Sequence, residues 1–160
     1  MLDARIPIAS RNPDLNEMIA NKTSIKKVVL LNKVDLADSK QTKKWKEYFE
    51  QMDYKVIETI GDTGKGIDEL KRYLESLQKG VNTTKTMIMG IPNVGKSTII
   101  NKLLGKNSLE AKNKAGVTKR LKWVRINDKV SIVDSPGMLW PKFEDTKIGN
   151  NLAAVRKYKR

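Results

Sequence analysis

The feature that most constrains this chain is a loop at residues 90–97, GIPNVGKS, which fits the pattern G-x-x-x-x-G-K-[S/T] at every position. It follows an apolar run that predicts a strand and opens a run that predicts a helix, the context in which this pattern binds phosphate. Glycines let backbone N–H groups face the anion, and the helix N-terminus adds a positive partial charge. We expect nucleotide contacts from Asn93, Val94, Gly95, Lys96, Ser97 and Thr98.

Within this loop, Lys96 would reach the β- and γ-phosphates, and the Ser97 hydroxyl would ligate Mg²⁺. Downstream, Asp134 and Gly137 have the spacing D-x-x-G at the end of another apolar run. The carboxylate would hold Mg²⁺ through water, and the Gly137 amide would approach the γ-phosphate. Thr118 lies between the motifs and would close on both groups as a switch, although an exposed loop threonine is the alternative. The predicted catalytic residues are therefore Lys96, Thr118 and Gly137, and the predicted Mg²⁺ set is Ser97, Thr118 and Asp134.

A second motif, N-K-x-D at residues 32–35, follows a β-branched run that predicts a buried strand. The Asp35 carboxylate can accept two hydrogen bonds from guanine, from the ring N–H and the exocyclic amine. Adenine offers no such pair, so the site would discriminate against it. Asn32 would fix the base edge, and the Lys33 stem would cover its face. Glu58 and Thr59 end the next predicted strand and would contact guanine from the other side, unless they belong to an ordinary loop.

The order of these motifs is unusual. In most GTP-binding proteins the phosphate loop comes before the guanine motif, and here it comes after it. A fold depends on which elements pack together, and chain ends generally lie at the surface, so relinking them can leave a pocket intact. We therefore predict a GTP/GDP site in an α/β fold: the three-layer G domain of P-loop NTPases, with a circularly permuted motif order and a mostly parallel sheet. Residues 1–160 would form one GTP-binding domain.

Alternating strand and helix patterns support this fold class. Asn12 and Pro13 predict a helix start, as cap and first helical residue. Residues 121–127 and 129–134 predict an antiparallel hairpin around a turn at Asn127 and Asp128. The other predictions are strands at 26–32, 54–60 and 84–90, and helices at 40–52, 66–80 (with Gly80 as C-cap) and 96–105.

The chain is strongly basic, with 32 Lys and Arg against 18 Asp and Glu, a net charge of +14. Such a charge attracts polyanions. Nucleic acid is the favoured partner, and a solvated lysine-rich surface is the alternative. Trp123 lies among cations, which suits base stacking, or packs in the core as a strand residue. No apolar run approaches the ~20 residues of a membrane span, so we expect no membrane association and a cytoplasmic location.

Several stretches together resemble the ribosome biogenesis GTPase A (YlqF) family of TRAFAC-class GTPases: DARIP, LLNKVDLAD, GIPNVGKSTIINKL, AGVTK and DSPGMLWPKFED. The resemblance runs from Asp3 to about Val155. It implies a bacterial GTPase that helps a late precursor of the large ribosomal subunit to mature, binds rRNA, and hydrolyses GTP when the particle stimulates it. We also expect the chain to be a monomer. The resemblance also implies that Asn93 matches an asparagine that holds K⁺ in related GTPases. Met138 follows D-x-x-G where many GTPases have a water-orienting glutamine, which implies slow intrinsic turnover.

The chain also departs from this family. It contains no histidine, whereas the family has an N-terminal histidine proposed to matter for hydrolysis, and any hydrolysis here would use a carboxylate or positioned water and cations. We expect truncation at both ends, a sheet that lacks one strand, and no C-terminal RNA-binding domain. Two alternatives therefore stay open: a nucleotide-gated RNA-binding module without useful turnover, and a signalling or transport GTPase that does not touch RNA.

Overall fold

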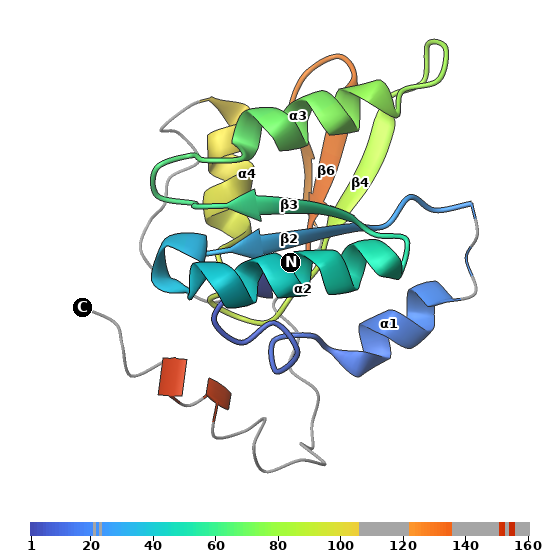
Figure 1. Ribbon diagram of the computed structural model, residues 1–160. Coiled ribbons are helices and arrows are strands. Elements are labelled where there is room, and N and C mark those ends of the chain that lie inside the picture. The colour runs from blue at the N-terminus through green and yellow to red at the C-terminus, as the bar shows by residue number, and fades with distance from the viewer. Residues whose placement is uncertain (21, 23, 106–121, 136–150, 153, 156–160) are drawn as a thin grey trace.

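The computed structural model describes residues 1–20, 22, 24–105, 122–135, 151–152 and 154–155 (Figure 1). Its described strands form two three-stranded sheets. In the first, β1 (Leu2–Asp3), β2 (Val28–Asn32) and β3 (Lys55–Thr59) are parallel and adjacent in that order. In the second, the order is β4 (Thr84–Ile88), β6 (Val130–Asp134), β5 (Lys122–Arg125). β4 and β6 are parallel, and β5 pairs with β6 antiparallel, which confirms the predicted hairpin.

Two of the described α-helices start at a side chain that accepts a hydrogen bond from a free N–H group of the first turn, and two start after a glycine. α1 (Pro13–Ala20) follows Asn12, whose Oδ1 accepts a hydrogen bond from the Asp14 amide at 2.9 Å. After the short 3₁₀ helix η1 (Val34–Leu36), α2 (Ser39–Gln51) is capped by Asp38, whose carboxylate accepts from the Gln41 amide at 2.8 Å. α3 (Ile67–Ser76) and α4 (Lys96–Leu104) both follow a glycine with positive φ.

One helix end was predicted wrongly. α3 ends at Ser76, and its C-cap is Leu77 in the right-handed helical conformation, so Gly80 is not the cap. Gly80 instead has φ 59° inside the turn that the isolated bridge between Lys79 and Asn82 closes. A glycine with positive φ serves a tight turn as well as a helix end, and the sequence does not distinguish the two.

Helices cover both faces of the first sheet, which gives three layers there. Figure 1 shows α3 and α4 on one side of β2 and β3, with α2 on the other. Alternation along the strands explains the arrangement. Leu30 and Ile57 belong to the core beneath α3 and α4, whereas Val29, Leu31 and Val56 pack with Phe49 of α2.

Trp123 lies on β5 but does not pack in the core, so that alternative from the sequence is wrong. Its side chain is 58% exposed, while that of its neighbour Val124 is 9% exposed and belongs to the core cluster of α3 and α4. Successive strand residues face opposite sides of a sheet, and Val124 takes the inward side.

In the described part of the chain no strand pairing joins the two sheets, but Leu30 and Ile57 of the first share one core cluster with Ile88 and Ile132 of the second. β1 pairs with the last two residues of β2, and the amino group of Met1 donates to the Met89 carbonyl, just after β4, at 2.7 Å. Behind Met1, a cavity of about 140 Å³ separates β2 from β4. In the described part of the chain none of the strands pairs with both β2 and β4, and the predicted shortage of a strand stays a prediction.

Candidate functional site

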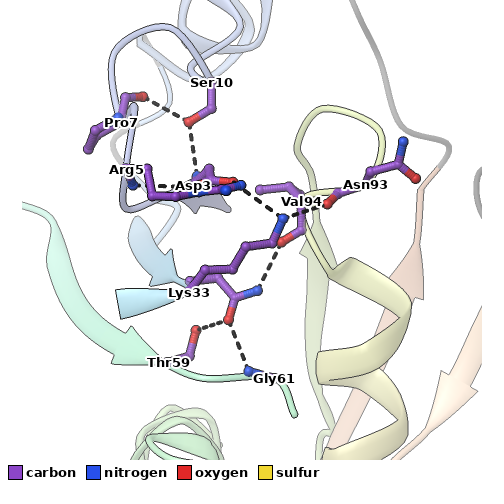
Figure 2. A network of polar contacts seen from close by, with 10 residues as sticks. Asp3, Arg5, Pro7, Ser10, Lys33, Thr59, Gly61, Asn93 and Val94 are labelled. Carbon is purple, nitrogen blue, oxygen red and sulfur yellow. Dashed lines mark hydrogen bonds and ion pairs between the residues drawn. The ribbon is translucent and has the colours of Figure 1, made fainter. Parts of the chain in front are cut away.

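The guanine motif and the phosphate loop, which are about 60 residues apart in the sequence, are in direct contact. Asn32 ends β2 and is 2% exposed. Its Nδ2 donates to the Val94 carbonyl of the phosphate loop at 2.9 Å. Its Oδ1 accepts from Thr59 Oγ1 at 3.0 Å and from the Gly61 amide at 3.2 Å (Figure 2). Asn32 therefore ties together three segments: the end of β2, the end of β3 and the phosphate loop.

Lys33 makes a second link between the same motifs. Its Nζ donates to the Asn93 carbonyl at 3.0 Å and lies 3.3 Å from Asp3 Oδ2 (Figure 2). Asp3 also pairs with Arg5 at 2.7 Å. Burial opposes ionisation of Asp3, but hydrogen bonds from Arg5 and the charge of Lys33 outweigh it, so the pKa of this carboxyl lies below its ordinary value.

The phosphate loop has the backbone that anion binding needs. Gly95 has φ 105° and Asn93 has φ 60°. A Cβ on Gly95 would lie 2.5 Å from Asn32 Nδ2, so only glycine lets the loop approach the guanine motif this closely. The loop then enters α4, whose first N–H groups have no partner within the helix and can face an anion.

Lys96, the first residue of α4, is buried beneath this loop. Its Nζ donates to the carbonyls of Gly90 and Ile91, both at 3.0 Å. An ammonium has three N–H donors, so one more is available for a phosphate oxygen. Burial lowers the pKa of Lys96, and the charge of Asp134 partly offsets this. A phosphate beside Lys96 would favour its charged form further.

The remaining predicted residues of the base site lie around these motifs. Asp35 is exposed within η1, and its negative charge contributes to raising the pKa of the Arg5 guanidinium, after the larger effect of the Asp3 hydrogen bond. Thr59 is fully buried and donates to Asn32, whereas Glu58 is half-buried at the same strand end.

Of the predicted Mg²⁺ ligands, the structure describes Ser97 and Asp134. Ser97 and Thr98 are exposed in the first turn of α4. Asp134 ends β6 in register with Ile88, so it lies beside the strand that leads into the phosphate loop. Hydroxyl and carboxylate oxygens are the hard donors that Mg²⁺ prefers. Three residues with predicted or implied roles, Thr118, Gly137 and Met138, lie outside the described residues.

Three residues at the site were not predicted from the sequence. Asp3 and Arg5 belong to the DARIP stretch, which the family resemblance pointed to without giving these residues a role. Gly61 follows β3 and donates its amide to Asn32. Arg5 pairs with Asp3 two residues away, but no local pattern shows that this pair lies at the site, because Asp3 meets Lys33 and Gly61 meets Asn32 about 30 residues away in the sequence. In the described part of the chain, none of the helices is long and apolar enough to cross a bilayer.

A parallel α/β sheet with this loop between a strand and a helix defines the class of P-loop nucleotide-binding proteins. The family model described as RsgA GTPase matches residues 15–144, and the chain belongs to this family. It is 40% identical to ribosome biogenesis GTPase A of Bacillus pumilus and 39% identical to that of Thermotoga maritima, over 97% and 96% of the chain. The chain spans 58% and 54% of those two proteins.

Solved structures agree with this assignment. The GNP-bound crystal structure of YlqF from T. maritima superposes with a TM-score of 0.71 at 34% identity, covering 97% of this chain and 57% of that one. A GDP-bound YlqF structure gives a TM-score of 0.69 at 33% identity, over 96% of this chain and 58% of that one. Both relatives are therefore longer proteins that contain the fold described above.

Proposed function

We propose that residues 1–160 are one GTP-binding domain in which the nucleotide motifs occur in circularly permuted order, and that it binds and hydrolyses GTP. The observation that carries this proposal is the direct bonding of Asn32 and Lys33 to the carbonyls of Val94 and Asn93. A guanine motif and a phosphate loop must lie at a defined separation to hold one nucleotide. Side chains that span both motifs support a single pocket that joins them, in spite of their inverted order.

In this pocket, Asp35 would accept the two N–H groups of guanine, and Lys96 with the amides of the phosphate loop would bind the phosphates. Ser97, Thr118 and Asp134 would hold Mg²⁺, which would neutralise charge on the phosphates and orient them. The Gly137 amide would approach the γ-phosphate, and Asn93 would hold K⁺. Hydrolysis of GTP would then depend mainly on positioning and electrostatic stabilisation.

We further propose that the chain acts in assembly of the large ribosomal subunit, with its precursor particle and rRNA as partners, as a cytoplasmic monomer. The relatives are named ribosome biogenesis GTPases. A net charge of +14 suits contact with RNA phosphates. Binding to a precursor particle should then weaken steeply with salt, since each neutralised phosphate releases counterions. Salt-independent binding would instead favour a GTPase that does not touch RNA.

The first test is a titration of the purified chain with fluorescent GDP, with excess ATP as competitor. We expect saturable binding that GTP displaces and ATP does not. Lys96→Ala should weaken this binding strongly, because it removes the buried ammonium beneath the phosphate loop. Binding that ATP displaces equally well, or a Lys96→Ala variant with intact affinity, would contradict the proposed pocket.

A second candidate is a nucleotide-gated RNA-binding module without useful turnover. It is favoured by the sequence itself, because Met138 stands directly after D-x-x-G and the chain contains no histidine. An apolar side chain cannot orient an attacking water. GTP turnover measured with and without large-subunit precursor particles separates the candidates. Stimulated hydrolysis supports the GTPase, and GTP-dependent particle binding without hydrolysis supports the module.

A further inference from the structure

Asp3 lies outside both nucleotide motifs but beside both of them. It ends β1 in register with Asn32 and is 3% exposed. Its amide donates to Ser10 Oγ at 2.9 Å, and that hydroxyl donates to the Pro7 carbonyl at 3.1 Å (Figure 2). The loop after β1 therefore folds back and fixes the Asp3 backbone, so its carboxylate has a defined position next to the site.

The carboxylate is oriented by Arg5. The guanidinium donates from Nε to Oδ1 at 2.9 Å and from the terminal nitrogen to Oδ2 at 2.7 Å. Such bidentate pairs hold both planes in one geometry. Oδ2 is at the same time 3.3 Å from Lys33 Nζ. Asp3 therefore stabilises two cations, one that orients the carboxylate and one that belongs to the guanine motif.

Lys33 needs this support because of its own conformation. Its φ is 64° and that of its partner Asn93 is 60°, a region that side chains other than glycine populate sparsely. The Lys33 side chain is 28% exposed, so its ammonium has access to water. Without a negative charge beside it, the ammonium could turn to solvent and release the Asn93 carbonyl.

We propose that Asp3 is a positioning residue for the nucleotide site. Its carboxylate, held by Arg5, keeps the Lys33 ammonium against the Asn93 carbonyl and so maintains the separation between the guanine motif and the phosphate loop. This inference rests on the proposed binding of guanine nucleotides. It requires Asp3→Asn, which keeps the shape and removes the charge, to lower GDP affinity about tenfold, the size expected for one charge-assisted contact.

The test is a double-mutant cycle in GDP affinity with Asp3→Asn, Lys33→Met and the double variant. If Asp3 acts through Lys33, its substitution weakens binding in the parent chain and has little further effect in the Lys33→Met background. A merely structural role would lower affinity by the same factor in both backgrounds. The charge control is Asp128→Asn, at an ion pair with Arg125 where the Asp128 side chain is 96% exposed; its affinity should equal that of the parent.

The outcomes distinguish a failure of the role of Asp3 from a failure of the proposed function. A parent chain that binds no GDP refutes the proposed function. A parent that binds GDP, with an unchanged affinity in Asp3→Asn, overturns the role of Asp3 alone. If Asp3→Asn does not fold, the role of Asp3 is tested by comparing the GDP affinities of the double variant and Lys33→Met. The double variant leaves only Arg5 without its carboxylate, whereas Asp3→Asn leaves both Arg5 and Lys33 without it. Equal affinity of those two variants supports the role of Asp3 through Lys33, and a much weaker double variant overturns it.

Discussion

Asn32 makes more contacts than its motif required. Its sequence context predicted a side chain that fixes the edge of the base, whereas the structure places its amide between the Val94 carbonyl and the β3 end. All of these bonds are buried. Removing a partner from a buried polar group costs about 1–3 kcal/mol, so Asn32 contributes to the shape of the site before any nucleotide binds.

The guanine specificity of the site is testable at Asp35. Asp35→Asn replaces one carboxylate oxygen by an NH₂ donor, which opposes the exocyclic amine of guanine but suits the carbonyl that xanthine has at that position. We expect GDP affinity to fall by at least tenfold, and xanthosine diphosphate to bind better than GDP. Competition between the two nucleotides against fluorescent GDP or its xanthine analogue measures this. An unchanged guanine preference would remove Asp35 from the base site.

Gly95→Ala tests the close approach of the two motifs. At φ 105° the new Cβ would lie 2.5 Å from Asn32 Nδ2, so either the loop or Asn32 must move. We expect at least tenfold weaker GDP binding. Gly105→Ala is the matched control, because it also imposes a side chain at positive φ, 64°, but meets nothing within 4 Å. It should cost about 1 kcal/mol of stability and leave GDP affinity unchanged; equal losses of affinity in both variants would mean that backbone strain alone is responsible.

At the scale of elements, the sequence predicted the strands and helices better than their ends. The helix now seen as α2 shows a clear apolar stripe and an Asp cap, and its predicted bounds differ by one residue at each end. The helix now seen as α3 was predicted to run to Gly80. A glycine that ends a helix and a glycine in a tight turn look alike in sequence, and Gly80 lies in a turn. The contacts around Asp3 could not be predicted, because they depend on how β1 lies against β2.

The cap of α2 makes a direct prediction. The Asp38 carboxylate accepts from the Gln41 amide at 2.8 Å, so Asp38→Ala leaves an N–H group of the first turn without its partner. We expect the free energy of unfolding to fall by about 1 kcal/mol, measured by urea denaturation. Asp38→Asn keeps a hydrogen-bond acceptor, so its free energy of unfolding should fall by much less. If both variants lose the same amount, the negative charge rather than the hydrogen bond stabilises this end.

At the scale of the whole molecule, stability should depend on pH through the amino terminus. Burial, and secondarily the charge of Lys96, lower the pKa of the Met1 amine from 8.0 to about 5. Between these values the unfolded chain binds a proton that the folded chain does not. Stability therefore falls as pH drops from 8 towards 5, by at most about 1.4 kcal/mol per pH unit. Urea denaturation across this range measures it.

N-terminal acetylation provides the control for the pH dependence, because it removes this titration and leaves the rest of the chain unchanged. The acetylated chain should show a flatter profile between pH 5 and 8. Carboxylates such as Asp3, whose pKa is lowered in the fold, act in a different window: they stabilise the fold above the unfolded pKa near 4, and that contribution is lost in more acidic solution. Identical profiles for the free and acetylated chains would show that the amine is solvated.

The joint between the two sheets gives the last prediction. β1 points into the cavity between β2 and β4, and among the described residues β1 pairs with only two residues of β2. Adding four strand-forming residues ahead of Met1, such as Lys-Val-Ile-Val, should continue β1. In the register that places Leu2 opposite Leu31, the added residues would lie opposite Lys26–Val29 on one side and beside β4 on the other. Each apolar side chain that enters the cavity would be buried, so we expect the free energy of unfolding to rise by about 2 kcal/mol.

The control is a Gly-Ser extension of equal length, which also displaces the terminal amine but provides no apolar side chain to bury. Slower hydrogen exchange in β2 and β4 of the first chain alone would show that the sheets have joined, and equal exchange in both chains would show that the cavity does not accept a strand.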